Sequence, residues 1–478
     1  MKHWIRLLTL PTTLGIVLLV ASPCPVRGQN DEANPQPAGR SVPALNGVIA
    51  NGEEDQSLDA LQPDMAPLTG VQTPTLGVPG LRHSYWVPGL QYGNMIQSQP
   101  FGQGNSSDWY VNNFVAGNVS LLDARSHAQL ALNATAGGTS STSSGQGSGF
   151  FSQLGLSQTF QWERWQLQFF DQFAYLPQSS FGFGAGTSLG IPGVGGPLVP
   201  PQPGLSGNYV PNQSIFTSVG PRYSNTFAPQ AVYAVSPRGS INFAGVYGIL
   251  RFVNSGNIDS NEVTGNIGYN YQLTTKDSIG VAERYSRFWY IGNPQVIGDN
   301  VVSIVYGRKV TGRLALQLYG GPDFATFAVP VGNKTSRVSA SEGATLTYQF
   351  SRSTLGVNYN HGLTGGSGIL VGANTDQIQA NLGFGISRVW RGSVNFGYSR
   401  NQNLAGSQSQ TGSTYDSWFA GGALSRPLGH NVSLSFAYSA QIQNSSAASC
   451  SSGNCNTNYN QNQISINFQW FTRPLVLH

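Results

Sequence analysis

The segment 463–470, which reads Gln-Ile-Ser-Ile-Asn-Phe-Gln-Trp, decides the fold of this chain. Its apolar residues, Ile464, Ile466, Phe468 and Trp470, alternate one by one with small or amide side chains. Successive side chains of a β-strand point to opposite faces, so this alternation predicts a strand. In a soluble β-sandwich the apolar face would be the core. Here the other face is polar but uncharged, so we expect lipid on the apolar side and a wet lumen on the other.

The same alternation recurs toward the N-terminus, in Ser152–Glu163, Gln377–Ile386 and Asn431–Ala440. Short basic turns such as Ser236–Gly239 and Ser387–Arg391 separate pairs of these segments about every forty residues. Longer Gly-, Asn- and Ser-rich loops join the segments on the other side. This arrangement predicts a train of β-hairpins with short turns at one end and long loops at the other, which is typical of a membrane barrel.

We expect an all-β fold, a transmembrane antiparallel up-and-down barrel of about 14–18 strands with sixteen as the best count. An even number places both chain ends on the short-turn side. Trp109–Leu122 is a further candidate strand. The sixteen expected strands are about 126–136, 150–162, 165–175, 222–235, 240–253, 260–272, 277–290, 298–308, 312–322, 337–350, 353–362, 374–386, 391–401, 413–424, 429–443 and 459–471.

Composition supports a membrane barrel. Only 9% of the residues are charged, against about 25% in ordinary soluble domains. Aromatic residues make up 11%, which argues against a wholly disordered chain. Past the N-terminal region, no segment has the roughly 18 consecutive apolar residues of a membrane helix. If the chain spans a membrane, it therefore does so with strands.

The chain divides into three predicted parts. Residues 1–28 are typical of a secretory signal peptide, with Lys2 and Arg6 before an apolar stretch and small residues near Gly28. Residues 29–107 are rich in Pro, Gly and Gln, and we expect a disordered periplasmic extension. Its aromatic part could instead pack at the barrel mouth or enter the lumen. Residues 108–478 are the expected barrel.

Two cysteines remain after the signal peptide, Cys450 and Cys455, in a polar loop. Export to an oxidising compartment favours a disulfide between them. A metal site would need more ligands, and no histidine is near in sequence, so we expect no metal.

Charged residues are few in the barrel region, and five of them are candidates for the lumen wall: Arg251, Glu262, Glu283, Arg284 and Arg287. Facing the lumen, they would form a charged ladder that orients solutes. Glu283 and Arg287 share a strand face, and Arg284 falls on the other unless a bulge intervenes. The alternative is a rim position or a structural ion pair.

The uncharged, Gly- and Pro-dense stretch Leu176–Pro221 is long for a loop in a compact fold. The order of turns and loops places it on the long-loop side. Three interpretations stay open: a constriction folded into the lumen, a contact with a neighbouring subunit or lipopolysaccharide, and a mobile surface loop.

Signs of catalysis are weak. Some outer-membrane barrels are hydrolases, so His361 deserves a test, but no acid lies beside it in the sequence. Phosphate-binding loops are not present either. We therefore expect no enzymatic activity, no cofactor and no nucleic-acid partner.

On these residues, the chain from about 126 to 478 resembles a bacterial outer-membrane β-barrel protein of the porin-like kind. Such barrels commonly end in a strand that closes with an aromatic residue, which the assembly machinery recognises; the candidate here is Gln463–Phe471, followed by an unusual tail, Thr472–His478. The resemblance implies outer-membrane localisation, contacts with lipid and assembly machinery, and a possible homo-oligomer.

Size favours a pore, because barrels of 16–18 strands leave an aqueous channel. The expected function is a passive channel for small neutral or weakly polar solutes. The alternatives are a non-conducting surface-binding or structural barrel and, less favoured, an outer-membrane hydrolase. A secreted soluble β-protein would carry more surface charge.

Overall fold

The computed structural model describes residues 84–98, 109–125, 127–142, 149–176, 215, 221–253, 257–328, 335–366, 368–387, 389–404, 413–429, 431–446, 458–473 and 475–476. These residues form strands joined by turns and loops. The strands are β1 (Tyr85–Ser98), β2 (Trp109–Ala124), β3 (Ala128–Ser141), β4 (Gly149–Gln161), β5 (Trp165–Leu176), β6 (Arg222–Ser236), β7 (Gly239–Phe252), β8 (Ser260–Gln272), β9 (Asp277–Tyr290), β10 (Asn293–Lys309), β11 (Leu314–Ala328), β12 (Thr335–Gln349), β13 (Ser353–Thr364), β14 (Ala373–Gly385), β15 (Arg391–Asn403), β16 (Thr414–Pro427), β17 (Val432–Ser445), β18 (Tyr459–Phe471) and β19 (Leu475–Val476).

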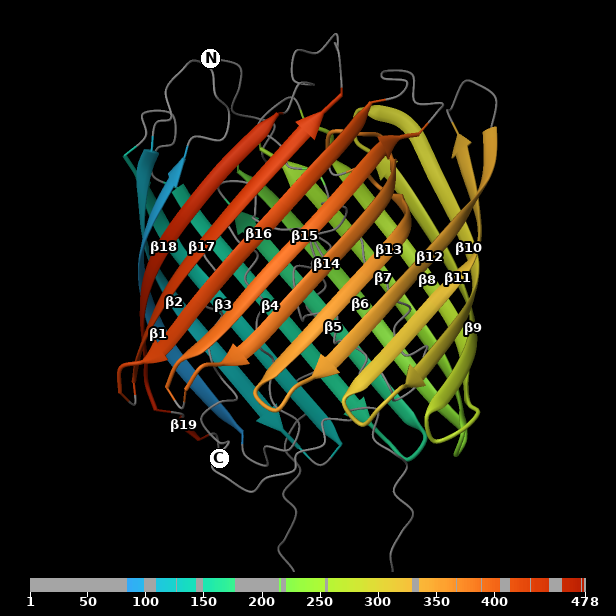
Figure 1. The fold of residues 1–478 in the computed structure, drawn as a ribbon, viewed down its shortest axis with the longest axis horizontal. Helices are drawn as coiled ribbons and strands as arrows, with labels where there is room; N and C mark the ends of the chain where they lie inside the picture. The colour runs from blue at the N-terminus through green and yellow to red at the C-terminus, as the bar shows by residue number, and fades with distance from the viewer. Residues whose placement is uncertain are drawn as a thin grey trace, which may run out of the picture. The chain divides into compact units, whose positions relative to one another are not determined.

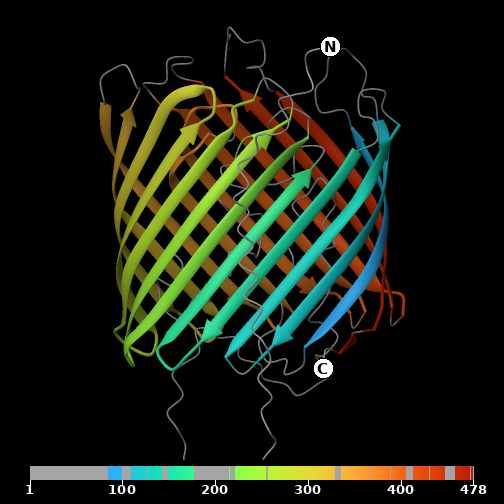
Figure 2. The same cartoon turned by 180° about the vertical axis from the view of Figure 1, so that it is seen from behind.

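The first eighteen strands close into one antiparallel barrel. Each strand pairs with its neighbours in the chain, and β1 pairs with β18 to complete the ring. The short β19 extends the ladder beside the start of β1, where Tyr85 lies opposite Val476. Figures 1 and 2 show the two halves of the wall, with strands tilted in the same sense throughout. The expected all-β, up-and-down barrel is confirmed.

The strand count is eighteen rather than the expected sixteen, because β1 and β2 also belong to the wall. β2 begins at Trp109, where the sequence already offered a candidate strand. β1 lies inside the segment that we expected to be a disordered extension, and that expectation is wrong for Tyr85–Ser98. Pro88, Gly89 and Gly93 hid its alternation, since proline and glycine ordinarily mark loops.

The glycines of β1 have a packing role that the sequence does not reveal. A side chain at Gly93 would collide with the ring of Phe114 on β2 and with Asn467 on β18. Pro88 has no backbone N–H to donate, but its carbonyl accepts a hydrogen bond of 3.0 Å from the amide of Thr472. Both residues therefore fit the seam where the barrel closes.

Alternation divides every strand into an outer and an inner face. On β18 the apolar side chains are exposed, from 38% for Ile466 to 46% for Phe468, whereas Gln463 and Asn467 are 0% exposed. A soluble protein would show the reverse, because its apolar side chains pack inward. The exposed apolar side chains recur around the ring and form an outer surface suited to lipid.

The two ends of the barrel differ. Short turns join β4 to β5 and β8 to β9, and hydrogen bonds such as Trp162 N to Trp165 O, at 2.8 Å, close them. At the opposite end most connections are longer. One exception is the two-residue turn Ile291–Gly292 between β9 and β10, where Gly292 has φ of +79°. Among the described residues, no helix is long and apolar enough to cross a membrane.

Some expectations lie outside the described residues. They concern the signal peptide at 1–28, most of the extension at 29–107, the Cys450–Cys455 pair and most of the loop at 176–221. These stay predictions from the sequence.

Gly93→Leu should destabilise the barrel at its seam. The added side chain must displace Phe114 or Asn467, and overpacking of this kind costs about 1–3 kcal/mol. The measurement is the urea midpoint of unfolding in detergent, followed by tryptophan fluorescence. Gly117→Leu is the matched control, because its Cβ would meet open space on the outer face of β2. Equal midpoints for the two variants would contradict the role given to Gly93.

Candidate functional site: the lumen

Most of the inner wall is polar without charge. Along β13, β14, β16–β18, β1–β5 and β7, eleven of the eighteen strands, the described inward side chains carry no charge. They are rich in amides and hydroxyls, such as Gln441, Gln469 and Ser439. Several of their polar atoms have no hydrogen-bond partner among the residues that the structure describes, including both side-chain polar atoms of Gln441 and of Gln469. This part of the wall offers neutral donors and acceptors.

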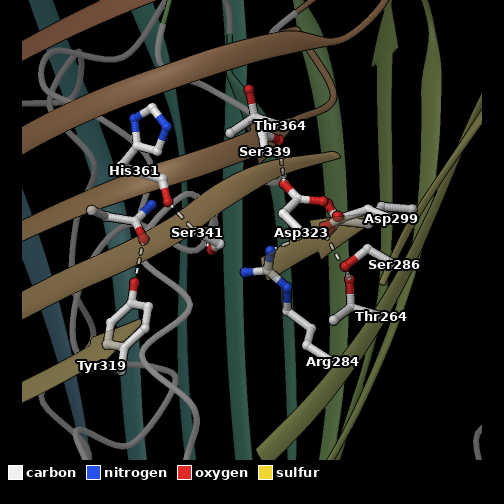
Figure 3. Close-up of polar contacts among 12 residues, drawn as sticks. Thr264, Arg284, Ser286, Asp299, Tyr319, Asp323, Ser339, Ser341, His361 and Thr364 are labelled. Atoms are coloured by element: carbon white, nitrogen blue, oxygen red, sulfur yellow. Dashed lines mark hydrogen bonds and ion pairs between the residues drawn. The ribbon is translucent and has the colours of Figure 1, made fainter. Parts of the chain in front are cut away.

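A cluster of charges occupies one arc of the wall, from β8 to β11 (Figure 3). Arg284 on β9 donates from Nη2 to Oδ2 of Asp299 on β10 at 3.0 Å. Asp323 on β11 lies beside Asp299 and accepts a 3.4 Å hydrogen bond from Ser339. All three charged side chains are almost fully buried. One guanidinium therefore faces two carboxylates, and the attraction between opposite charges is strong where water is excluded.

Two polar groups flank this cluster. On the β8 side, Thr264 Oγ1 lies 3.0 Å from both Glu262 Oε1 and Ser286 Oγ. On the β13 side, the hydroxyl of Tyr319 donates to Oδ1 of Asn360 (Figure 3). The charged arc is thus continuous with hydroxyl and amide groups on both sides, which hold its side chains in place.

The five charges predicted for the lumen divide between the two faces. Arg284 and Glu262 point inward with the buried polar residues of β8 and β9. Glu283 and Arg287 are exposed on the outer face of β9, and Arg251 also lies on the outer face of β7. This differs from the expectation of one lumen ladder. No bulge interrupts the pairing of β8 with β9, so neighbouring residues keep opposite faces.

Sequence reasoning missed Asp299 and Asp323, which complete the charged arc. Each is a single acid within an alternating apolar strand, and each shares the parity of inward residues: Asp299 with Val301, and Asp323 with Ala325. That parity was readable from the sequence. Their proximity to Arg284 was not, because it depends on the register of three strands.

The arc changes from polar to apolar toward the long-loop end. Inward residues of β9–β11 pack there with Leu363, Val371 and Leu404 in one apolar cluster: Phe288, Tyr290, Ile297, Ala325 and Phe327. The connection from β13 to β14 folds over this cluster. Tyr290 donates a 3.1 Å hydrogen bond to the carbonyl of Gly365, and Gly372 has φ of +76°. A side chain at Gly372 would collide with Ile297 and Leu404.

Ile215 shows where one point of the long loop lies. It is 2% exposed and packs with Leu370, Ala373 and Tyr415. Ile215 precedes β6, whereas Tyr415 lies on the inner face of β16, on another part of the ring. Ile215 therefore lies on the lumen side, and the three interpretations of the rest of this loop stay predictions.

His361 has an acidic neighbour that the sequence did not reveal. Its Nδ1 lies 2.6 Å from Oδ1 of Asp376, which is its direct partner on β14. The pairing continues across the outer face to Arg400 on β15 and Asp416 on β16. The row thus places Arg400 between two acids on neighbouring strands, Asp376 and Asp416. The imidazole of His361 therefore has the carboxylate that a catalytic triad requires. A triad also needs a nucleophile in contact with the ring.

Within the described residues, no group of three or more His, Cys, Asp or Glu side chains is placed to hold a metal ion. The acids of the lumen arc are instead engaged with Arg284, Thr264 and Ser339.

Comparison with known proteins finds solved structures of low similarity. The chain is similar to OccK2 (OpdF) of Pseudomonas aeruginosa, with 9% identity, a TM-score of 0.42, and coverage of 82% of this chain and 98% of that one. It is also similar to the outer membrane protein opdK of the same organism, at 9% identity, a TM-score of 0.40, and 81% and 99% coverage. OccAB3 of Acinetobacter baumannii has the same four values as opdK. No protein-family model and no curated protein matches the chain.

The closed barrel, apolar outside and polar inside, is the architecture of a porin-like protein of the bacterial outer membrane. The TM-scores all lie below 0.5 and carry no argument about this chain, so the activity has to follow from the residues of the lumen.

Arg284→Met should destabilise the folded barrel by about 3–5 kcal/mol, because it leaves the carboxylates of Asp299 and Asp323 buried and adjacent without a cation. Urea unfolding at neutral pH measures the effect. Adding Asp299→Asn to Arg284→Met should recover much of the loss. A single variant as stable as the wild type would show that the ion pair does not hold this arc together.

Proposed function

We propose that this protein is a passive channel of the bacterial outer membrane for small neutral or weakly polar solutes. The observation that carries the proposal is the inner wall of a closed eighteen-stranded barrel, which is polar and uncharged over most of its circumference. A barrel of about eight strands fills its interior with side chains, whereas one of 16–18 strands encloses an aqueous channel. Neutral amides and hydroxyls exchange hydrogen bonds with water and solute without trapping either.

Passage would involve no covalent step. A solute enters at the long-loop end, where Ile215 and the apolar cluster around Phe327 narrow the opening. It then passes between the uncharged wall and the arc that holds Arg284, Asp299 and Asp323. A field from one side orients dipolar solutes, and a low-dielectric wall focuses that field. The apolar entrance disfavours strongly hydrated ions, because they would lose water there.

Single-channel recording tests the proposal directly. The full-length mature protein, refolded and inserted in a planar bilayer, should give stepwise conductance. Liposomes that contain it should swell faster in a neutral solute than in a charged solute of equal size. Folding is checked by a heat-dependent shift in gel mobility. Silence from folded protein would leave the non-conducting surface-binding or structural barrel as the better hypothesis.

The charged arc gives a second test. Glu262, Asp299 and Asp323 outnumber Arg284 between β8 and β11, whereas Arg222 on β6 and Arg337 on β12 place one arginine on each side of the arc. The acids should therefore set a local preference for cations, and removing one of them should lower it. Glu262→Gln should move the reversal potential in a potassium chloride gradient toward zero. Glu283→Gln is the matched control, since this neighbouring acid lies on the outer face and should leave the potential nearly unchanged. An equal shift in both variants would contradict the placement of the field.

The hydrolase alternative rests on His361 and Asp376. An esterase assay of the refolded protein, with His361→Ala as control, decides it: activity that His361→Ala abolishes would replace the channel as the first function.

A further inference from the structure

The outer face carries an apolar hollow where lipid would otherwise meet a continuous wall. It has a volume of about 490 Å³ and lies over β5–β9. Gly245 on β7 is paired directly with Gly265 on β8, and these two positions form its floor. A Cβ at Gly265 would meet nothing within 4 Å, which shows that the hollow is open there. Phe169, Phe243 and Tyr285 rise around it.

A carboxylate borders this hollow. Glu283 is the seventh of the fourteen residues of β9, so it lies at the middle of a spanning strand. Its side chain is exposed on the outer face between Val281 and Tyr285, both exposed apolar residues. The neutral side-chain amide of Asn300 donates a hydrogen bond of 3.3 Å from Nδ2 to Oε1 of Glu283. No ion pair of Glu283 is recorded within the part of the chain that the structure describes.

Arg287 lies on the same outer face of β9, four residues further toward the long-loop end. It too is exposed, and among the described residues it forms no recorded ion pair. Lipid chains can neither donate to a carboxylate nor accept from a guanidinium. Ionisable residues at membrane depth almost always pair with one another or face a protein or water-filled interior. The outer face of β9 is therefore an unusual surface to leave in contact with lipid.

We propose that the hollow and the two charges of β9 form an interface with a second copy of this chain, in a two-fold dimer within the membrane. A small-residue surface lets two backbones approach closely, as it does between membrane helices. The same patch meets itself in a two-fold interface. The proposal requires the membrane location given above but not conduction through the lumen.

Charge complementarity supports this occupant. Four residues of strand span about 13 Å, and strands of membrane barrels tilt by about 35–45°. A two-fold axis along the membrane normal through Tyr285 would then place Glu283 of one copy below Arg287 of the second copy, about 10 Å away along the normal. The long side chains of arginine and glutamate extend toward each other across such a gap. A lipid acyl chain in the hollow would leave both charges without partners.

The test is the oligomeric state of the full-length protein in lipid nanodiscs, measured by native mass spectrometry and by chemical cross-linking at several dilutions. The wild type should be a dimer. Gly265→Leu fills the hollow and should raise the dimer dissociation constant by about tenfold or more. Gly117→Leu, at an equally open outer position on β2, should leave it unchanged.

Exchanging the two charges tests the contribution of the ion pairs to dimer stability separately from the contribution of the hollow's shape. Glu283→Arg should weaken the dimer, because two arginines then face each other. The double variant Glu283→Arg with Arg287→Glu should restore it. A wild-type monomer at all dilutions, with or without a co-purified lipid, would overturn the proposal, as would a dimer that tolerates Gly265→Leu. Conductance measured in the same preparations shows whether the channel function stands independently of either result.

Discussion

Every peptide group in the wall of this barrel must find its hydrogen-bond partner within the wall, because hydrocarbon offers none. The rest of the structure depends on this constraint. It requires a closed ring, so β1 must pair with β18, although their residues lie more than 360 positions apart in the chain, as in the contact of Asn462 with Ser98. It also fixes the register of each pair, and the register decides which side chains meet in the lumen.

Once the register is fixed, the two faces of one strand can serve different media. Arg284 and Glu283 are consecutive residues, yet one belongs to a buried ion pair in the lumen and the other to the outer face. The lumen combines a neutral wall with one charged arc, and the outer face combines an apolar surface with a few ionisable side chains. The proposed conduction depends on the first combination, and the proposed dimer depends on the second.

The sequence was sufficient for the class of fold because the alternation in segments such as Gln463–Trp470 is long and regular. It was insufficient for β1, where the glycines that the seam requires look like loop residues. The alternation along β9 correctly placed Arg284 on the opposite face from Glu283 and Arg287. It did not show which of the two faces points into the lumen. The meeting of Arg284 with Asp299 and Asp323, and of His361 with Asp376, depends on strand pairing that no single segment encodes.

The seam between the first and last strands also has a consequence in time. A helical membrane protein can insert each helical hairpin as it is synthesised. This ring stays open until the last strand of the barrel, Tyr459–Phe471, has been synthesised and has paired with β1. Until then the exposed edges of β1 and of the newest strand are templates for pairing with other chains. Because contacts between distant segments form slowly, the chain must remain protected from aggregation after export. Because β18 is synthesised after the other strands of the ring, the pairing of its thirteen residues with β1 commits the whole polypeptide to its native state.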